Sequence, residues 1–100
     1  MNKNSDILNE SYEALFALGL VNNHCQFSEN WLLRSRRYWS MCRSSGRKPS
    51  VSALGALAAR LKSHYEILKA SRSGELRYQA ELIYPLVRKV WTRFYESALE

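Results

Sequence analysis

Apolar residues recur at three- and four-residue spacing along nearly the whole chain, which is the pattern of amphipathic helices. A first helix is expected to begin at Ser5 or Asp6 and to stop at Gly19, because glycine suits the left-handed position after a helix. Its apolar face comprises Ile7, Leu8, Tyr12, Leu15, Phe16 and Leu18. No stretch alternates apolar and polar residues for long enough to suggest a strand. The sequence therefore predicts an all-α fold of five helices.

Two short helices are expected next. Asn22 or Asn23 can supply the capping side chain of the second helix. One face of this helix carries Phe27, Ser28, Trp31 and Leu32. Ser35 is the expected N-cap of the third helix, which covers about residues 36–45 and closes at Gly46.

Two longer helices are expected in the C-terminal half. Pro49 and Ser50 begin the fourth helix. Gly55 in its interior costs about 1 kcal/mol relative to Ala, which suggests that another backbone approaches closely there. The stretch SRSG, residues 71–74, separates it from a long fifth helix. Pro85 lies inside the fifth helix and should kink or split it.

The fifth helix carries a heptad-like apolar seam. The seam and the apolar residues beside it cover more than half of the helix circumference, which is more than one small core needs. We therefore expect residues 71–100 to be a dimerisation element packed on a domain of residues 1–70. The expected dimer contacts are Ile83, Val87, Val90, Trp91 and Phe94. Alternatively, the extra apolar face packs on the first helix of the same chain.

The net charge of +6 is concentrated in the middle of the chain. Residues 31–73 contain ten Lys or Arg and one acidic residue, Glu66, whereas residues 1–30 carry −3 and residues 74–100 carry no net charge. A basic block of this kind attracts phosphates, either of nucleic acid or of anionic lipid. The stretch RSRRYWSMCRSSGRKPS, residues 34–50, is its densest part.

An enzyme is not expected. A chain of 100 residues forms one small core without room for a deep catalytic cleft. The sequence has no paired carboxylates within the basic block, no Ser-His-Asp candidate and no Gly-rich phosphate loop. We expect no cofactor and no small-molecule ligand.

The cysteines and histidines could compose a zinc site only by long-range folding, because no CxxC pair is present. The four residues concerned are Cys25, Cys42, His24 and His64. Reduced thiols, and no metal, are the simpler expectation. No apolar stretch is long enough for a signal peptide or a membrane span, so a cytoplasmic protein without membrane contact is expected.

The middle of the chain resembles a known family in a specific set of positions. They are Ser35, Trp39, Ser40, Cys42, Gly46, Arg47, Lys48, Pro49 and Ser50, followed by Leu54, Leu57, Ala58 and Leu61, with Phe27, Ser28 and Trp31 upstream. In this order they are similar to the Cro/phage-repressor (XRE-like) helix-turn-helix family over about residues 5–68. Two departures are the turn LLR, where the family usually has Gly, and Arg43, where an acidic residue is common. The same segment resembles small, mostly uncharacterised bacterial proteins with an FS..WL.RS..Y motif.

This resemblance implies a transcriptional regulator that binds double-stranded DNA in a sequence-specific manner, as a homodimer. The recognition helix, about 36–45, would enter the major groove, with Trp39 and Cys42 facing the core. Base contacts are expected from Arg36, Arg37 and Ser40, since an arginine fork can read guanine. Phosphate contacts are expected from Arg34, Arg43, Arg47 and Lys48.

Two other readings stay open. All the arginines could bind phosphates alone, without reading sequence, in duplex DNA or in RNA. From another functional class, a small helical adaptor or antagonist could dock an acidic partner protein through the same arginine patch.

Overall fold

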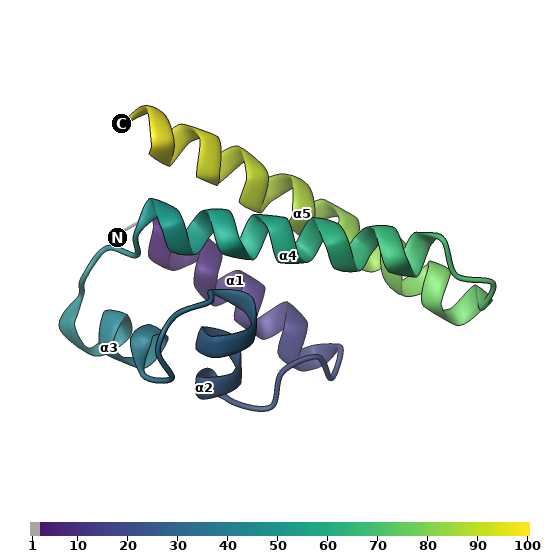
Figure 1. The fold of residues 1–100 in the computed structure, drawn as a ribbon, viewed down its shortest axis with the longest axis horizontal. Coiled ribbons are helices and arrows are strands. Elements are labelled where there is room, and N and C mark those ends of the chain that lie inside the picture. Colours follow the sequence, from purple (N-terminus) through teal and green to yellow (C-terminus); the bar gives the residue numbers. More distant parts are fainter. Residues whose placement is uncertain (1–2) are drawn as a thin grey trace.

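Residues 3–100 are described by a computed structural model, and no strand occurs among them (Figure 1). These residues fold into five α-helices, with one short π-helical segment following the second. Their bounds are α1 Lys3–Ala17, α2 His24–Gln26, η1 Phe27–Trp31, α3 Tyr38–Ser45, α4 Val51–Lys69 and α5 Gly74–Leu99. The predicted all-α fold with a long C-terminal helix is confirmed.

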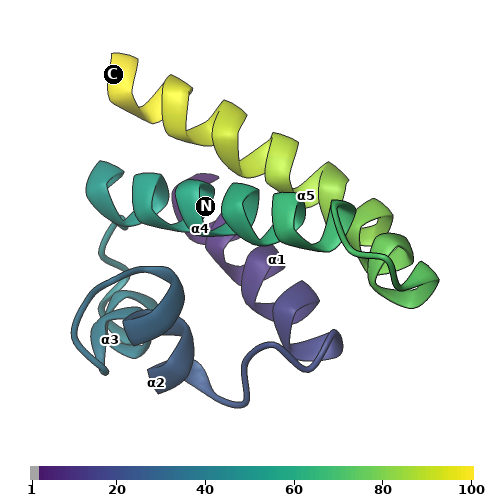
Figure 2. The same ribbon diagram turned by 45° about the vertical axis from the view of Figure 1, so that its right-hand side comes forward.

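The two longest helices, α4 and α5, run antiparallel and lie side by side along most of their length (Figures 1 and 2). Helix α1 packs against α5, while α2, η1 and α3 form a smaller cluster on one side of this hairpin. Buried leucines of α4, among them Leu54, Leu57 and Leu61, meet Ile83 and Val90 of α5. One contiguous core therefore joins the basic middle of the chain to the C-terminal helix.

This packing corrects the predicted dimer seam. Ile83, Val87 and Val90 are 1%, 6% and 0% exposed within a single chain. In this fold they are not available to a partner, so their assignment to a dimer interface was wrong. The reason is that α4 and α1 together cover the seam within the chain, whereas the alternative had named the first helix alone. Trp91 and Phe94 are partly buried and pack against the same core.

Gly55 does sit at a close approach, but the neighbour is an aromatic ring rather than a backbone. A Cβ added at Gly55 would lie 2.9 Å from Cε1 of Phe94. The absence of a side chain on α4 thus lets the Phe94 ring of α5 lie against it.

Pro85 lies inside α5 without dividing it, so the predicted split does not occur. A proline in a helix interior removes one hydrogen bond and costs about 3 kcal/mol. The helix stays intact because its residues on both sides of Pro85 are buried in the core: Ile83 before it, and Leu86 and Val87 after it.

Several of the predicted helix ends are confirmed. Asn23 and Ser50, both expected at helix starts, each cap a helix by accepting a hydrogen bond from the backbone N–H three residues later. Ser73 caps α5 in the same way, within the break predicted at residues 71–74. Gly19 and Gly46 follow α1 and α3 in the left-handed conformation, with φ of +74° and +68°. These local signals divide the chain where the sequence indicates.

Candidate nucleic-acid interface

Contacts with η1 hold helix α3 in place. Trp39 is 1% exposed and Cys42 3% exposed, which confirms both as core residues. The backbone N–H of Trp39 donates to the Oγ of Ser28 at 3.0 Å, and Ser28 is fully buried. The Trp39 ring also packs edge-on against Phe27. One hydrogen bond and one aromatic contact thus orient α3 on the preceding segment.

The start of α3 differs from the prediction. Ser35 does not cap the helix; instead its carbonyl accepts from the N–H of Tyr38 at 3.0 Å, which closes a turn. The helix begins at Tyr38, with Arg37 in the N-cap position and no side-chain cap. Arg36 and Arg37 therefore project from the turn before the helix, both exposed, and not from its first turn.

The turn between η1 and α3 contains a leucine in a conformation that normally selects glycine. Leu33 has φ of +53° and is exposed. The N–H of Arg34 donates to the carbonyl of Ser28 at 2.9 Å, so the chain reverses tightly just after η1. The unusual LLR turn thus keeps the left-handed geometry, at a cost of about 1–2 kcal/mol for a residue with a Cβ.

Two of the predicted DNA-contacting residues lie toward α2. The Oγ of Ser40 is 3.5 Å from Nδ1 of His24, and Nη1 of Arg43 is 3.1 Å from Nε2 of the same ring. Because a guanidinium only donates hydrogen bonds, Nε2 is the acceptor in this arrangement. The Arg43 guanidinium also lies 5.9 Å from the centre of the Trp39 ring. Ser40, expected to contact a base, and Arg43, expected to contact a phosphate, therefore lie on the side of α3 that faces α2, where Arg43 is still exposed.

The open face of α3 instead carries Met41 and Ser44. Met41 is 58% exposed, and Ser44 is exposed one turn further on. Together with Arg37 they form a row at spacings of four and three residues, opposite Trp39 and Cys42. Met41 and Ser44 were not predicted as part of the site, although their helical spacing from Arg37 is a signal in the sequence.

Arg34 and Tyr38 connect α3 to the start of α4. The hydroxyl of Tyr38 accepts from the backbone N–H of Ser50 at 2.9 Å, and Nη2 of Arg34 is 3.3 Å from the Oγ of Ser50. The Arg34 guanidinium lies 5.8 Å from the Tyr38 ring centre. These contacts brace the basic surface against the long hairpin.

The cations of this surface differ in their partners. Lys48 pairs with Glu100 at 2.8 Å, and Arg93 of α5 binds the same carboxylate. Hydrogen bonds from Lys48 and then Arg93 lower the pKa of Glu100 to about 2. The guanidinium groups of Arg36, Arg37 and Arg47, by contrast, make no ion pair and no hydrogen bond with any residue of the described range 3–100. Lys48 is thus partly neutralised, whereas three arginines around α3 keep their full charge.

The cysteines and histidines are not gathered into a zinc site. Within residues 3–100, no three His, Cys, Asp or Glu side chains are placed to hold a metal ion. His24 contacts α3, whereas His64 packs edge-on against Trp31. Burial, followed by the nearby charge of Arg60, lowers the pKa of His64. Both cysteines are free thiols.

None of the helices in the described part of the chain is both long enough and apolar enough to span a membrane. Neither a curated protein nor a solved structure matches the sequence. The family described as Family of unknown function (DUF6626) matches residues 8–98. This match covers nearly the whole chain, and the chain therefore belongs to the DUF6626 family.

Proposed function

We propose that this protein binds duplex DNA through the basic surface around α3 and acts as a transcriptional regulator. The observation that carries the proposal is a set of exposed guanidinium groups at the two ends of α3, those of Arg36, Arg37 and Arg47, which are unpaired within residues 3–100. Phosphates are their natural partners, since release of counterions from DNA drives such contacts.

The dimensions of α3 support this proposal. The helix has 8 residues, so it is about 12 Å long, close to the major-groove width of about 12 Å. Arg36 and Arg37 precede its first residue and Arg47 follows its last. Cations at both ends of a helix of this length can reach the phosphate backbones on both walls of one groove.

The roles of the arginines follow from their positions. Arg37 continues the row of Met41 and Ser44 on the open face, which makes it the best candidate for a base contact. Arg36 and Arg47 flank the helix and suit phosphates. Ser40 and Arg43, held by His24, act in this proposal by orienting α3.

The test is a comparison of binding to a selected duplex and to random duplex DNA. Sequences bound from a random pool supply the selected duplex. Arg37→Ala should weaken the selected complex by about 1–3 kcal/mol and the random complex far less. Arg47→Ala should weaken both alike and reduce the salt slope by about 1.

Arg72→Ala is the matched control, because this exposed arginine lies in the turn between α4 and α5, at the end of the hairpin away from α3. It should leave both affinities unchanged. Duplex affinity that does not change with salt would contradict the proposal and favour the alternative partner, an acidic protein docked on the same arginines.

A further inference from the structure

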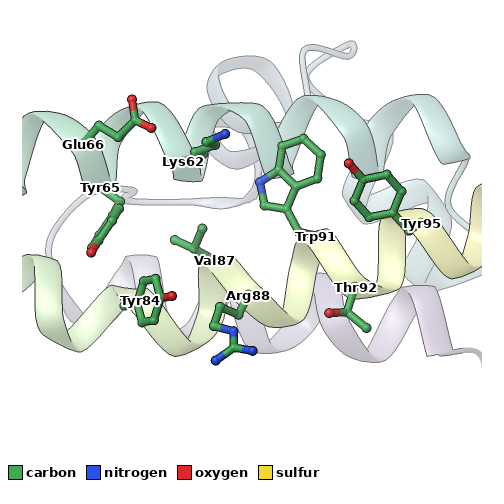
Figure 3. A pocket seen from close by; sticks show the side chains of 9 residues that line it. All are labelled: Lys62, Tyr65, Glu66, Tyr84, Val87, Arg88, Trp91, Thr92 and Tyr95. Atoms are coloured by element: carbon green, nitrogen blue, oxygen red, sulfur yellow. The ribbon is translucent and has the colours of Figure 1, made fainter.

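A groove lined by aromatic side chains runs between α4 and α5 (Figure 3). Its volume is about 410 Å³, and its aromatic lining comprises Tyr65, Tyr84, Trp91 and Tyr95. Tyr84 is 43% exposed and Tyr95 60% exposed, although both are large and mostly apolar. An exposed cluster of aromatic residues in a concave site is typical of a binding surface.

The aromatic rings are already arranged in two pairs. At one end of the groove, the ring centres of Tyr65 of α4 and Tyr84 of α5 are 5.1 Å apart. At the other end, the ring centres of Trp91 and Tyr95 are 5.5 Å apart. Val87, almost fully buried, forms the floor between them. Because the rings rest on one another and on two long helices, little conformational freedom is lost when a partner docks.

The charges beside the groove are mainly positive. Lys62 stands on the α4 side and Arg88 on the α5 side, near the middle of the groove (Figure 3). Neither forms an ion pair with residues 3–100, and Nζ of Lys62 lies 5.7 Å from the centre of the Trp91 ring. Glu66 is the one acidic residue in the lining. The indole N–H of Trp91 has no acceptor within the described residues.

We propose that this groove binds an acidic amphipathic helix of a partner protein. An apolar side chain of that helix would lie between the two aromatic pairs, with carboxylates beside Lys62 and Arg88. A shallow trough between two antiparallel helices suits a third helix, as in other helix-in-groove complexes. Trp, Tyr and Arg are also the residue types that contribute most to protein–protein binding.

The charges disfavour a second copy of this chain as the occupant. A two-fold copy centred on the groove would bring the Lys62 and Arg88 of one protomer against those of the other. Each chain also carries a net charge of +6. Carboxylates on the partner satisfy the same cations.

The experiment uses two synthetic helical peptides as probes. One has leucines along a single stripe with glutamates on both flanks, and its twin has lysine in place of each glutamate. Binding is followed on the full chain through the indole N–H resonances of its three tryptophans. We expect the glutamate peptide to shift the Trp91 signal in a saturable way, without moving that of the buried Trp39, and the lysine peptide to have no effect.

Charge reversal sharpens the test. The double variant Lys62→Glu with Arg88→Glu should reverse the preference, so that the lysine peptide binds about tenfold more tightly than the glutamate peptide. Arg72→Glu with Arg77→Glu makes the same change in net charge outside the groove and should keep the original preference. Circular dichroism of each variant establishes that it is folded.

Three outcomes would overturn the proposal. Equal affinity for both peptides would leave only non-specific hydrophobic contact, and no binding of either would exclude an acidic helix. A concentration-dependent dimer in sedimentation, lost in Tyr84→Ser and kept in Tyr78→Ser, would identify a second copy as the occupant. Tyr78 is the matched control, since it is exposed on α5 but does not line the groove.

Discussion

The segment from η1 to α3 and the hairpin of α4 with α5 represent two ways of building a helical surface. The hairpin consists of two long, regular helices with an apolar stripe between them. The η1–α3 segment is short and irregular, with a π-helical stretch, a left-handed leucine and an uncapped helix start. The hairpin is therefore stabilised by many similar contacts, whereas the position of α3 depends on a few particular ones.

This difference has a functional consequence. An isolated helix as short as α3 is not stable in water, so its orientation comes from tertiary contacts. Those contacts leave one face of α3 open, and the guanidinium groups of Arg36, Arg37 and Arg47 beside it have no partner among residues 3–100. Substitutions in the two regions should therefore act through different kinds of interaction.

Trp39→Ala should have the largest effect. Removal of a buried aromatic side chain costs about 3–5 kcal/mol of unfolding free energy. Trp39 joins α3 to η1, so DNA binding should disappear together with the fold. Urea denaturation measures the loss, and a well-folded variant that has lost DNA binding alone would contradict this structural role.

Gly55→Leu tests the hairpin at its tightest point. The new side chain meets the Phe94 ring, so the variant should lose about 1–3 kcal/mol through overpacking. Removing that ring relieves the clash, and the double variant Gly55→Leu with Phe94→Ala should be more stable than the sum of the two single changes predicts. Additive effects in this double-mutant cycle would show that the two residues do not meet.

Ser28→Ala tests the buried hydrogen bond between η1 and α3. It leaves the N–H of Trp39 buried without its acceptor, which should cost about 1–3 kcal/mol. Ser44→Ala is the control, because Ser44 is exposed and should change stability by less than about 0.5 kcal/mol. Thermal unfolding compares the two, and equal small effects would mean that the hydrogen bond does not hold α3.

Leu33→Gly should be slightly stabilising. It relieves the left-handed strain of about 1–2 kcal/mol, and part of the gain is offset by the greater freedom of glycine in the unfolded chain. We expect a net gain of about 0.5–1 kcal/mol. Gly46→Ala, at a glycine with similar φ, should have the opposite sign. A loss of stability in Leu33→Gly would indicate that the leucine side chain contributes contacts that outweigh its strain.

The smallest effect is expected at Glu100, which links the two regions through Lys48 and Arg93. Its pKa falls from the ordinary value of 4.5 to about 2 in the folded chain. The stabilisation is therefore present above pH 4.5 and is lost as the pH falls toward 2. Glu100→Gln should lower the thermal midpoint slightly at neutral pH, and the difference from the original chain should vanish near pH 2. A difference that does not change with pH would show that the ion pairs are not its cause.

Much of the fold follows from local signals in the sequence. The periodicity of apolar residues and the caps at Asn23, Ser50 and Ser73 depend only on neighbouring residues, so the helices could be predicted without knowledge of the fold. The core positions of Trp39 and Cys42 follow from the same spacing. The existence of the helices was therefore predictable, although part of the second helix is the π-helical η1. The start of α3 was not, because the N–H of Tyr38 is satisfied by the carbonyl of Ser35 rather than its side chain, and the N–H of Trp39 by Ser28 of η1.

The candidate site was predictable in its charge but not in its geometry. The excess of basic residues in 31–73 is a property of the sequence alone. Which of those cations remain free of partners within the chain cannot be read from the sequence alone. Lys48 pairs with a residue 52 positions away, and Arg43 contacts His24 across 19 positions. Neither pairing can be predicted from a pattern of neighbouring residues in the sequence.

By itself, the sequence determined that this chain is helical, where most of its helices begin and end, and that its middle is strongly basic. These properties depend on residues close together along the chain. The tertiary structure alone decided that the heptad-like seam of α5 is covered by α4 and α1, that Ser40 and Arg43 lie toward α2, and that an aromatic groove stays open between α4 and α5. Those outcomes depend on which helix faces meet in the folded chain. An apolar stripe predicts that a face will be buried, but it does not specify which helix will bury it.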